Sequence, residues 1–254
     1  MNTLVNALKK NIVDLNPLVL NITNSVTPDV IANGLLSLGA SPVMSHDVAE
    51  IEELVSYARA IVINIGTLDE TFKQLARTTC EIAEVLKKPI VLDPVGAGAT
   101  HLRTAFAKEL LLNYNIAIVR GNASEIGALS GQPGRTKGVD STEDSQVMKE
   151  AARVVAIAHD CVVAMSGAVD VITSTTRCES IARGSALMPL VVGSGCLLTS
   201  VVAAFHAVHQ DAFEAAFYGS YFYALCGERA ADISLLPGSF RVAMIDALYQ
   251  YLED

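Results

Sequence analysis

The sequence predicts an α/β fold built on a mostly parallel central sheet. Apolar segments at residues 60–65, 89–92 and 161–165 have the length and the β-branched content of fully buried strands. Residues 69–86, between the first two, have the length of a helix. A strand–helix–strand unit of this kind is typical of parallel sheets, which are covered on both faces. Because no Pro/Gly/Ser-rich linker or internal repeat interrupts the 254 residues, we predict one domain over residues 1–254.

The other elements follow in order after a short amphipathic start. Further strands are expected at residues 17–22, 42–45, 116–120, 171–174 and 180–183, of which 171–174 looks like a hairpin arm after 161–165. A helix capped by Thr27, with Pro28 at its first position, is expected to end near Gly39. Further helices are expected at residues 101–112, 143–159, 195–209, 212–233 and 239–252. Residues 131–142 are expected to form a polar loop, and His206 and His209 are interpreted as ordinary helix residues.

Charge and cysteine usage limit the functional classes. The net charge of −9 argues against general binding to nucleic acids or anionic membranes, which needs a basic surface. The five cysteines are odd in number and contain no C-x-x-C pair, which suits reduced thiols in a cytoplasmic protein without disulfides or zinc. The sequence has no signal-peptide pattern, and its apolar runs are shorter than a membrane span. We therefore expect a soluble cytoplasmic protein.

A glycine-rich corner, Gly193-Ser194-Gly195-Cys196, precedes a long apolar helix. The glycines allow a tight turn and a close approach of the backbone to a ligand. The N–H groups and the positive dipole end of the following helix form an anion site in such a corner. Cys196 in the first turn would then face the anion. The alternative is a turn selected for packing, with Cys196 as a small buried hydrophobe.

Polar residues also follow two predicted strands. Asp93 ends the strand at 89–92 and is followed by Pro-Val-Gly, while Arg120 ends the strand at 116–120. Asn122 and Glu125 come next and, three residues apart, share one helical face. Asp93 and Glu125 offer the hard oxygen ligands that Mg²⁺ prefers, and Arg120 offers a cation for phosphate. The alternatives are a turn Asp and a capping box between Asn122 and Glu125.

Asn21, Asn24 and Met44 fall at the ends of the first two predicted strands, on one edge of the sheet. These residues are candidates for ligand binding. The alternatives are that the asparagines stabilise turns and that Met44 fills the core. A nicotinamide dehydrogenase is excluded, because no glycine fingerprint follows the strand at 17–22. The later Gly96-Ala97-Gly98 has His101 where such a fingerprint needs a third glycine.

Three motifs in this order, Asp-Pro-Val-Gly at 93–96, Gly-Asn-x-x-Glu at 121–125 and Gly-Ser-Gly-Cys at 193–196, resemble those of the ribokinase-like kinases. More narrowly, Leu-Asn-Ile-Thr-Asn at 20–24, residues 91–100 and the cysteine resemble the hydroxyethylthiazole kinases over nearly the whole chain. The resemblance implies a three-layer αβα sandwich. It also implies ATP-dependent phosphorylation of 4-methyl-5-(2-hydroxyethyl)thiazole, which salvages thiazole for thiamine biosynthesis. One departure is Ser194, where the family usually has Thr.

The resemblance also implies roles for individual residues and a trimer with active sites between subunits. Cys196 stands where most ribokinase-like enzymes carry an Asp base, and is the candidate catalytic residue. The remaining implied site residues are Met44, Gly193 and Asn24 for the substrate, Arg120, Ser166 and Asn122 for ATP, and Asp93 and Glu125 for Mg²⁺. The alternatives are a hydroxymethylpyrimidine or pyridoxal kinase of the same fold, which Cys196 argues against, and a non-catalytic nucleotide-binding protein.

Overall fold

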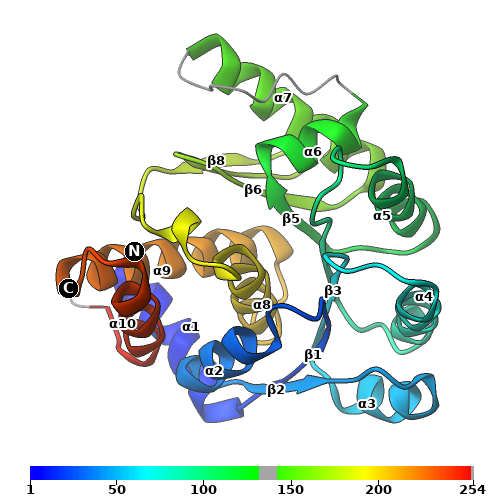
Figure 1. The fold of residues 1–254 in the computed structure, drawn as a ribbon, viewed down its shortest axis with the longest axis horizontal. Coiled ribbons are helices and arrows are strands. Elements are labelled where there is room, and N and C mark those ends of the chain that lie inside the picture. The colour runs from blue at the N-terminus through cyan, green and yellow to red at the C-terminus, as the bar shows by residue number, and fades with distance from the viewer. Residues whose placement is uncertain (132–141, 253–254) are drawn as a thin grey trace.

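A computed structural model describes residues 1–131 and 142–252, arranged around one eight-stranded sheet (Figure 1). The strands lie in the order β2-β1-β3-β4-β5-β6-β7-β8. The pairs from β2 to β6 are parallel, and β6-β7 and β7-β8 are antiparallel. This confirms the predicted α/β class with its mostly parallel sheet. The strands are β1 Leu18–Ile22, β2 Ser41–Met44, β3 Ala60–Asn64, β4 Ile90–Asp93, β5 Ile118–Asn122, β6 Val162–Ser166, β7 Asp170–Thr173 and β8 Cys178–Ile181.

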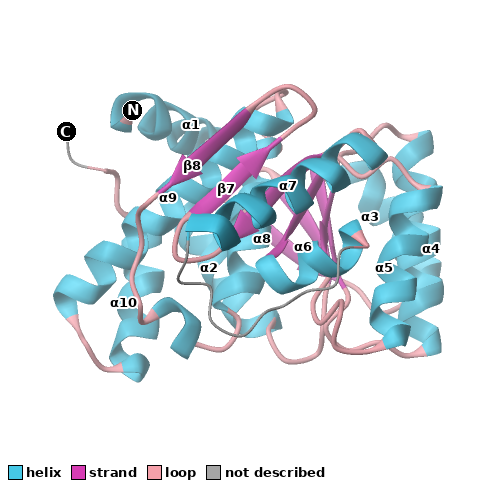
Figure 2. Cartoon of the chain, turned by 90° about the horizontal axis from the view of Figure 1, so that it is seen from above, coloured by secondary structure: helices cyan, strands magenta, loops and turns pink. Residues whose placement is uncertain are grey.

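Helices cover both faces of the sheet, so the molecule has three layers (Figures 1 and 2). One face carries α1 Asn2–Leu15, α2 Pro28–Leu38, α8 Ser194–His206, α9 Ala212–Ile233 and α10 Pro237–Tyr249. The other carries α3 Ile51–Tyr57, α4 Glu70–Val85, α5 His101–Asn113, α6 Ala123–Ser130 and α7 Thr142–His159. Successive strand residues enter opposite cores: Val19 packs under the first group of helices, and Leu20 under the second.

Some predicted boundaries differ from the structure. α3, preceded by a 3₁₀ turn at Val48–Glu50, was not predicted, and β5 continues two residues past 120, to Asn122. The helix predicted at 195–209 begins one residue earlier and ends at His206, so His209 lies outside it. The predicted polar loop at 131–142 lies outside the described residues, apart from its two end residues.

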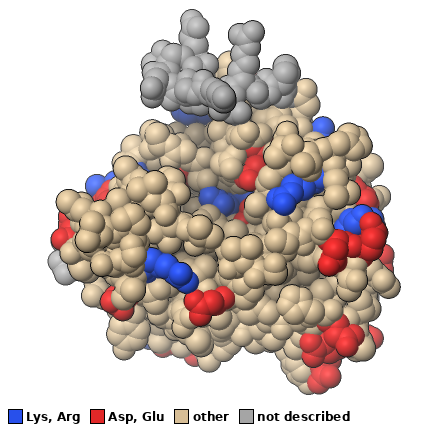
Figure 3. All heavy atoms as spheres, viewed as in Figure 1, with Lys and Arg blue, Asp and Glu red and all other residues tan. Residues whose placement is uncertain are grey.

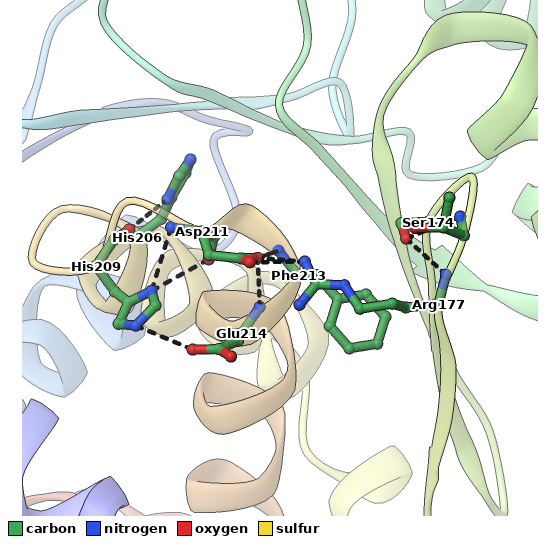
Figure 4. Close-up of polar contacts among 8 residues, drawn as sticks. Ser174, Arg177, His206, His209, Asp211, Phe213 and Glu214 are labelled. Atoms are coloured by element: carbon green, nitrogen blue, oxygen red, sulfur yellow. Dashed lines mark hydrogen bonds and ion pairs between the residues drawn. The ribbon is translucent and has the colours of Figure 1, made fainter.

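Hydrogen bonds hold the loop between α8 and α9 and the start of α9 (Figure 4). The Asp211 carboxylate accepts the N–H groups of Phe213 and Glu214 and thereby caps α9. Arg177, between β7 and β8, donates to both Asp211 oxygens at 2.7 Å. His209 lies 3.2 Å from Glu214, and burial lowers the pKa of His206. His206 Nδ1 also lies 2.9 Å from the His209 carbonyl oxygen, so both histidines make contacts within the segment that joins α8 to α9.

Candidate active site

A cavity of about 920 Å³ lies at the carboxyl ends of β4, β5 and β6 and at the N-terminus of α8. The molecular surface is hollowed near the centre of this face, and basic and acidic side chains meet in the hollow (Figure 3). The structure brings together most of the predicted site residues in its lining: Asp93, Arg120, Asn122, Glu125, Ser166, Gly193 and Cys196. Met44 and Asn24 are not among the lining residues.

The first turn of α8 forms one wall of the cavity. Gly193 precedes the helix with φ +86°, and a Cβ there would come within 2.7 Å of Val30, so glycine is required for both reasons. The buried Tyr223 hydroxyl donates to the Ser194 carbonyl at 2.8 Å and holds this turn from α9. The Ser194 N–H donates to Val191. The predicted anion site at residues 193–196 therefore has one N–H group fewer than expected.

Arg120 lies over the same turn of α8. Its side chain is almost fully buried, and its Nη2 donates to the Ser166 hydroxyl at 2.6 Å. A Cβ at Gly195 would lie 2.6 Å from Nη1, so the absence of a side chain at 195 makes room for the guanidinium. The buried Nε has no hydrogen-bond partner among the described residues. The guanidinium thus retains donor capacity beside the cavity.

Asp93 is the most buried carboxylate of the site, with 1 % of its surface exposed. Its Oδ2 accepts from Asn64 Nδ2 at 2.8 Å and from the Thr199 hydroxyl at 2.7 Å. Oδ1 is also buried, yet has no partner within the described part of the chain. Burial raises the pKa of Asp93 to about 6, against the opposing effect of the Arg120 cation. This carboxylate consequently has a free oxygen and titrates close to neutrality.

Glu125 and Asn122 form the capping box that the sequence left open. Glu125 Oε2 accepts the Asn122 N–H at 2.8 Å, and Asn122 Oδ1 accepts the Glu125 N–H at 3.0 Å. Glu125 Oε1 accepts the Gly96 N–H at 2.9 Å, which ties α6 to the loop after β4. The carboxylate is therefore held by backbone donors at the cavity wall. Its role as a metal ligand stays a prediction.

A magnesium ion can be tested against this donor set. Asp93 Oδ1 is an unpartnered carboxylate oxygen at the cavity, which suits a hard cation. Among the described residues, no group of three or more His, Cys, Asp or Glu side chains could hold a metal. The residues therefore fit an ion that keeps mainly water and phosphate ligands, as Mg²⁺ does in kinases.

Cys196 is the third residue of α8 and is half-buried. Its Sγ accepts Asn24 Nδ2 at 3.5 Å. A helix N-terminus alone lowers a thiol pKa. Here burial raises the pKa of Cys196, and the nearby Asp93 carboxylate raises it further. Desolvation thus outweighs the helix dipole, and the protonated thiol is the favoured form.

Asn24 and Met44 lie beside the cavity lining rather than in it. Asn24 Oδ1 accepts the Val26 N–H at 2.9 Å and the Thr27 hydroxyl at 3.2 Å. Thr27 does precede α2, but its hydroxyl makes no capping bond to that helix. Met44 ends β2, pairs with Asn21 of β1, and packs half-buried against one core. The observed contacts are those of a turn residue for Asn24 and of a core residue for Met44. The roles of both residues in substrate binding stay predictions.

The sequence did not single out Asn64, Thr199 or Tyr223. Asn64 carried a usable signal, because a polar residue before glycine at the end of a buried strand is the pattern that identified Asp93. Thr199 lies one turn beyond Gly195 on the helix predicted from residue 195, and this spacing places it above the first turn. We find no local sequence signal for Tyr223.

The fold and the site define a class of protein. A ribokinase-like superfamily protein from Enterococcus faecalis V583 has a TM-score of 0.67 and 16% identity, covering 96% of this chain and 89% of that one. At this identity the likeness shows the fold alone, which is ribokinase-like.

The sequence comparisons define the family. The model of the Hydroxyethylthiazole kinase family matches residues 9–254. The hydroxyethylthiazole kinase of Leptospira biflexa serovar Patoc is 44% identical over 253 residues, covering 97% of this chain and 95% of its own. The structure of hydroxyethylthiazole kinase from Pyrococcus horikoshii OT3 has a TM-score of 0.90 and 37% identity, covering 97% and 93%. The chain belongs to the hydroxyethylthiazole kinase family.

Proposed function

We propose that the chain transfers the terminal phosphoryl group of ATP to the hydroxyl of 4-methyl-5-(2-hydroxyethyl)thiazole, recovering this thiazole for thiamine biosynthesis. The observation that carries the proposal is the Cys196 thiol at the start of α8, in one cavity with Asp93 and Arg120, in a chain of this family. In the reaction the alcohol oxygen bonds to the γ-phosphorus, and the bond from that phosphorus to the bridging oxygen breaks, which releases ADP. The alcohol proton passes late in the transfer to an oxygen of the transferred phosphoryl group and from there to water.

The nucleotide would occupy the side of the cavity formed by β5 and β6. Arg120 supplies the cation for the phosphates, Ser166 holds its guanidinium, and Asn122 lines the same wall. Mg²⁺ bound with ATP supplies neutralisation of phosphate charge in this chemistry. Asp93 Oδ1 would hold the ion directly, and Glu125 would reach it through the lone pairs that its backbone donors leave free.

The reacting groups need little help beyond alignment. Because phosphoryl transfer passes through a loose transition state, the alcohol loses little of its proton before attack. A protonated Cys196 thiol would therefore orient the hydroxyl rather than remove its proton outright. Arg120 of β5, whose guanidinium lies against the first turn of α8, would balance the charge on the transferring group.

The substrate alcohol would lie near Gly193, with Asn24 and Met44 contributing to its pocket. Asn24 and Met44 do not line the cavity formed by one chain. A substrate pocket that a second subunit completes would allow both residues to contact the substrate. The exposed side chains of Leu190 and Val192, just before Gly193, provide an apolar surface for such a contact. We propose a homotrimer with active sites between subunits, testable by light scattering of the purified protein.

The remaining expectations concern the whole chain. We propose that residues 1–254 form one kinase domain that acts in the cytoplasm, and the five unpaired cysteines, all within the described residues, support this compartment. No helix in the described part of the chain is long and apolar enough to cross a membrane.

An ATP-consumption assay with a panel of alcohols tests the function. We expect turnover with hydroxyethylthiazole and little with hydroxymethylpyrimidine or pyridoxal. Preferred use of either of the latter would assign the other kinase activity of this fold. Nucleotide binding without consumption by any alcohol would identify a binding protein instead.

Arg120→Ala tests the nucleotide side of the site. We expect a large loss of kcat/KM for ATP and a much smaller change in the KM for the thiazole, because the guanidinium is assigned to phosphate. Steady-state kinetics with each substrate varied in turn measures both values. Unchanged constants for ATP would remove Arg120 from the nucleotide site.

A further inference from the structure

A continuous line of hydrogen bonds runs from Asp93 to Cys196 along the carboxyl ends of three neighbouring strands. Asn64, the last residue of β3, is fully buried and donates its Nδ2 to Asp93 Oδ2 at 2.8 Å. Asn64 Oδ1 accepts Asn24 Nδ2 at 2.9 Å. Asn24 Nδ2 also donates to Cys196 Sγ at 3.5 Å. Asn64 therefore stands between the two groups that the proposed function uses.

The direction of this line is fixed by the backbone. An amide side chain has a donor end and an acceptor end, which its hydrogen-bond network must identify. The Gly66 N–H lies 3.0 Å from Asn64 Oδ1, and the Val26 N–H lies 2.9 Å from Asn24 Oδ1. Because a backbone N–H can only donate, both oxygens are acceptors. Both amide nitrogens then point along the line, one toward Asp93 and the other toward Cys196.

The consequence for Cys196 concerns its proton. Since Sγ accepts an N–H from Asn24, the S–H of the thiol points away from Asn24. Because Cys196 lines the cavity, its S–H can turn into the space assigned to the substrate alcohol. A thiol so oriented can donate to the alcohol oxygen and hold it in place.

We propose that Asn64 is a positioning residue that orients Asp93 directly and Cys196 through Asn24, an inference that rests on the proposed function for its catalytic consequence. Substitution of a positioning residue of this kind would alter the orientation of both Asp93 and Cys196. Substitution of a residue that only fills the core between the strands and the helix would alter neither. The two cases are distinguished by the reactivity of the Cys196 thiol, which can be measured without substrate.

The matched control is Asn21, a second fully buried asparagine on the adjacent strand β1. Its Oδ1 accepts the Ser200 hydroxyl of α8 at 2.8 Å, and its Nδ2 donates to its own strand at Val19. Ser200 Oγ also lies 3.3 Å from the Cys196 carbonyl oxygen. Asn21 therefore connects a strand to the backbone of the same helix turn, but not to the Cys196 thiol or to Asp93. The test compares Asn64→Leu and Asn64→Ser with Asn21→Leu and Asn21→Ser.

The experiment measures alkylation of Cys196 by iodoacetamide, followed by peptide mass spectrometry. A Cys178→Ser background removes the exposed cysteine, and Cys80, Cys161 and Cys226 are buried. Without Asn64 Oδ1, Asn24 loses the acceptor that helps to aim its Nδ2, and a weaker N–H contact with Sγ stabilises the thiolate less. We therefore expect the Asn64 variants to react about 3- to 10-fold more slowly. We also expect kcat to fall about 10- to 100-fold with the KM for ATP within about threefold, as for loss of an interaction made in the transition state. The Asn21 variants are expected to match the parent protein in both values.

Alkylation of folded Asn64 variants within twofold of the parent rate would overturn the proposal. Equal effects in the Asn21 variants would also overturn it, because they would indicate a general packing effect. If both Asn64 variants fail to fold while the Asn21 variants fold, Asn64 is a structural residue and the proposal is wrong. Absence of thiazole phosphorylation in the parent protein would contradict the proposed function alone, since the alkylation comparison still measures the coupling.

Discussion

Gly195 and Gly238 each occupy the second position of a helix, but a methyl group at the two positions would meet different surroundings. A Cβ at residue 195 would lie 2.6 Å from Nη1 and 3.3 Å from Nη2 of Arg120. A Cβ at residue 238 would meet no atom of the described residues within 4 Å. Since neither glycine has a positive φ, alanine is compatible with both backbones. Comparison of Gly195→Ala with Gly238→Ala therefore separates the effect of helix propensity, which both variants share, from the effect of the contact with Arg120, which only Gly195→Ala has.

The structure sets the size of the effect. Ordinary contact begins at 3.4 Å, so the guanidinium must retreat by 3.4 − 2.6 = 0.8 Å to accommodate Gly195→Ala. The end of a flexible side chain moves more easily than the helix, and we expect the fold to survive. A displacement of about 1 Å in a positioning group can cost about 10²-fold in rate. We therefore expect kcat/KM for ATP to fall about 10²-fold, or roughly 2.7 kcal/mol.

Steady-state kinetics with ATP varied and denaturant melts of both variants provide the assay. Gly238→Ala is expected to retain full activity and gain up to about 1 kcal/mol in unfolding free energy from helix propensity. If folded Gly195→Ala keeps a kcat/KM for ATP within about threefold of Gly238→Ala, the position of Arg120 does not limit nucleotide use, and the reasoning is refuted.

Three further outcomes are expected. Cys196→Ala is expected to retain roughly a hundredth to a tenth of the turnover at saturating ATP, a smaller loss than most of the ~10²–10⁴-fold range for removal of a dedicated base. Cys196→Asp is expected to equal or exceed the turnover of the parent protein. A folded but inactive Cys196→Ala, with Cys196→Asp no better, would make the thiol essential. Glu125→Gln is expected to raise the Mg²⁺ concentration needed for activity. It also replaces an oxygen that accepts a backbone N–H, so denaturant melts are expected to show a loss of about 1–3 kcal/mol. An unaltered Mg²⁺ titration would leave Glu125 only its capping role. Asp93→Asn is expected to be inactive yet relatively more stable at pH 8 than at pH 4. Because the folded-state pKa of Asp93 is raised from 3.8 to about 6, the folded protein binds the extra proton, and this group's contribution to stability falls as pH rises from about 4 to about 6. A stability difference between variant and parent that is constant over that range would contradict this linkage.

The sheet could be predicted because its strands are buried on both faces. Parallel strands covered by helices read as continuous apolar runs, and residues 60–65 and 161–165 are runs of this kind. α3 was missed, since its seven residues are too few for a clear helical period and only Ile51 and Val55 are buried. The end of α8 was placed too far along, because the sequence gives no stop signal after His206, whose Nδ1 lies 2.9 Å from the carbonyl oxygen of His209 in the following loop.

The residues that line the cavity could be predicted where they lie at the carboxyl end of a strand. The carboxyl ends of parallel strands meet at one edge of a sheet, and this rule alone brings Asp93 and Arg120 together. The pKa of Cys196 could not be predicted from the helix N-terminus, because the dominant cause is burial by distant segments. The contact of Gly195 with Arg120 depends on a side-chain conformation that no sequence pattern specifies.

A cysteine in the place of a carboxylate follows from the charges around it. Four carboxylates, those of Asp93, Glu125, Asp170 and Glu228, already line the cavity, against the guanidiniums of Arg120 and Arg183. Arg183 is paired with Glu228, and the phosphates of ATP would add further negative charge. An aspartate at residue 196 would be a stronger proton acceptor, but it would place a further carboxylate at the helix N-terminus to which we assign the phosphates. The uncharged thiol avoids this repulsion and relies on alignment. Cys196→Asp is accordingly expected to raise the KM for ATP even where it raises kcat, and a lowered KM would contradict this electrostatic account.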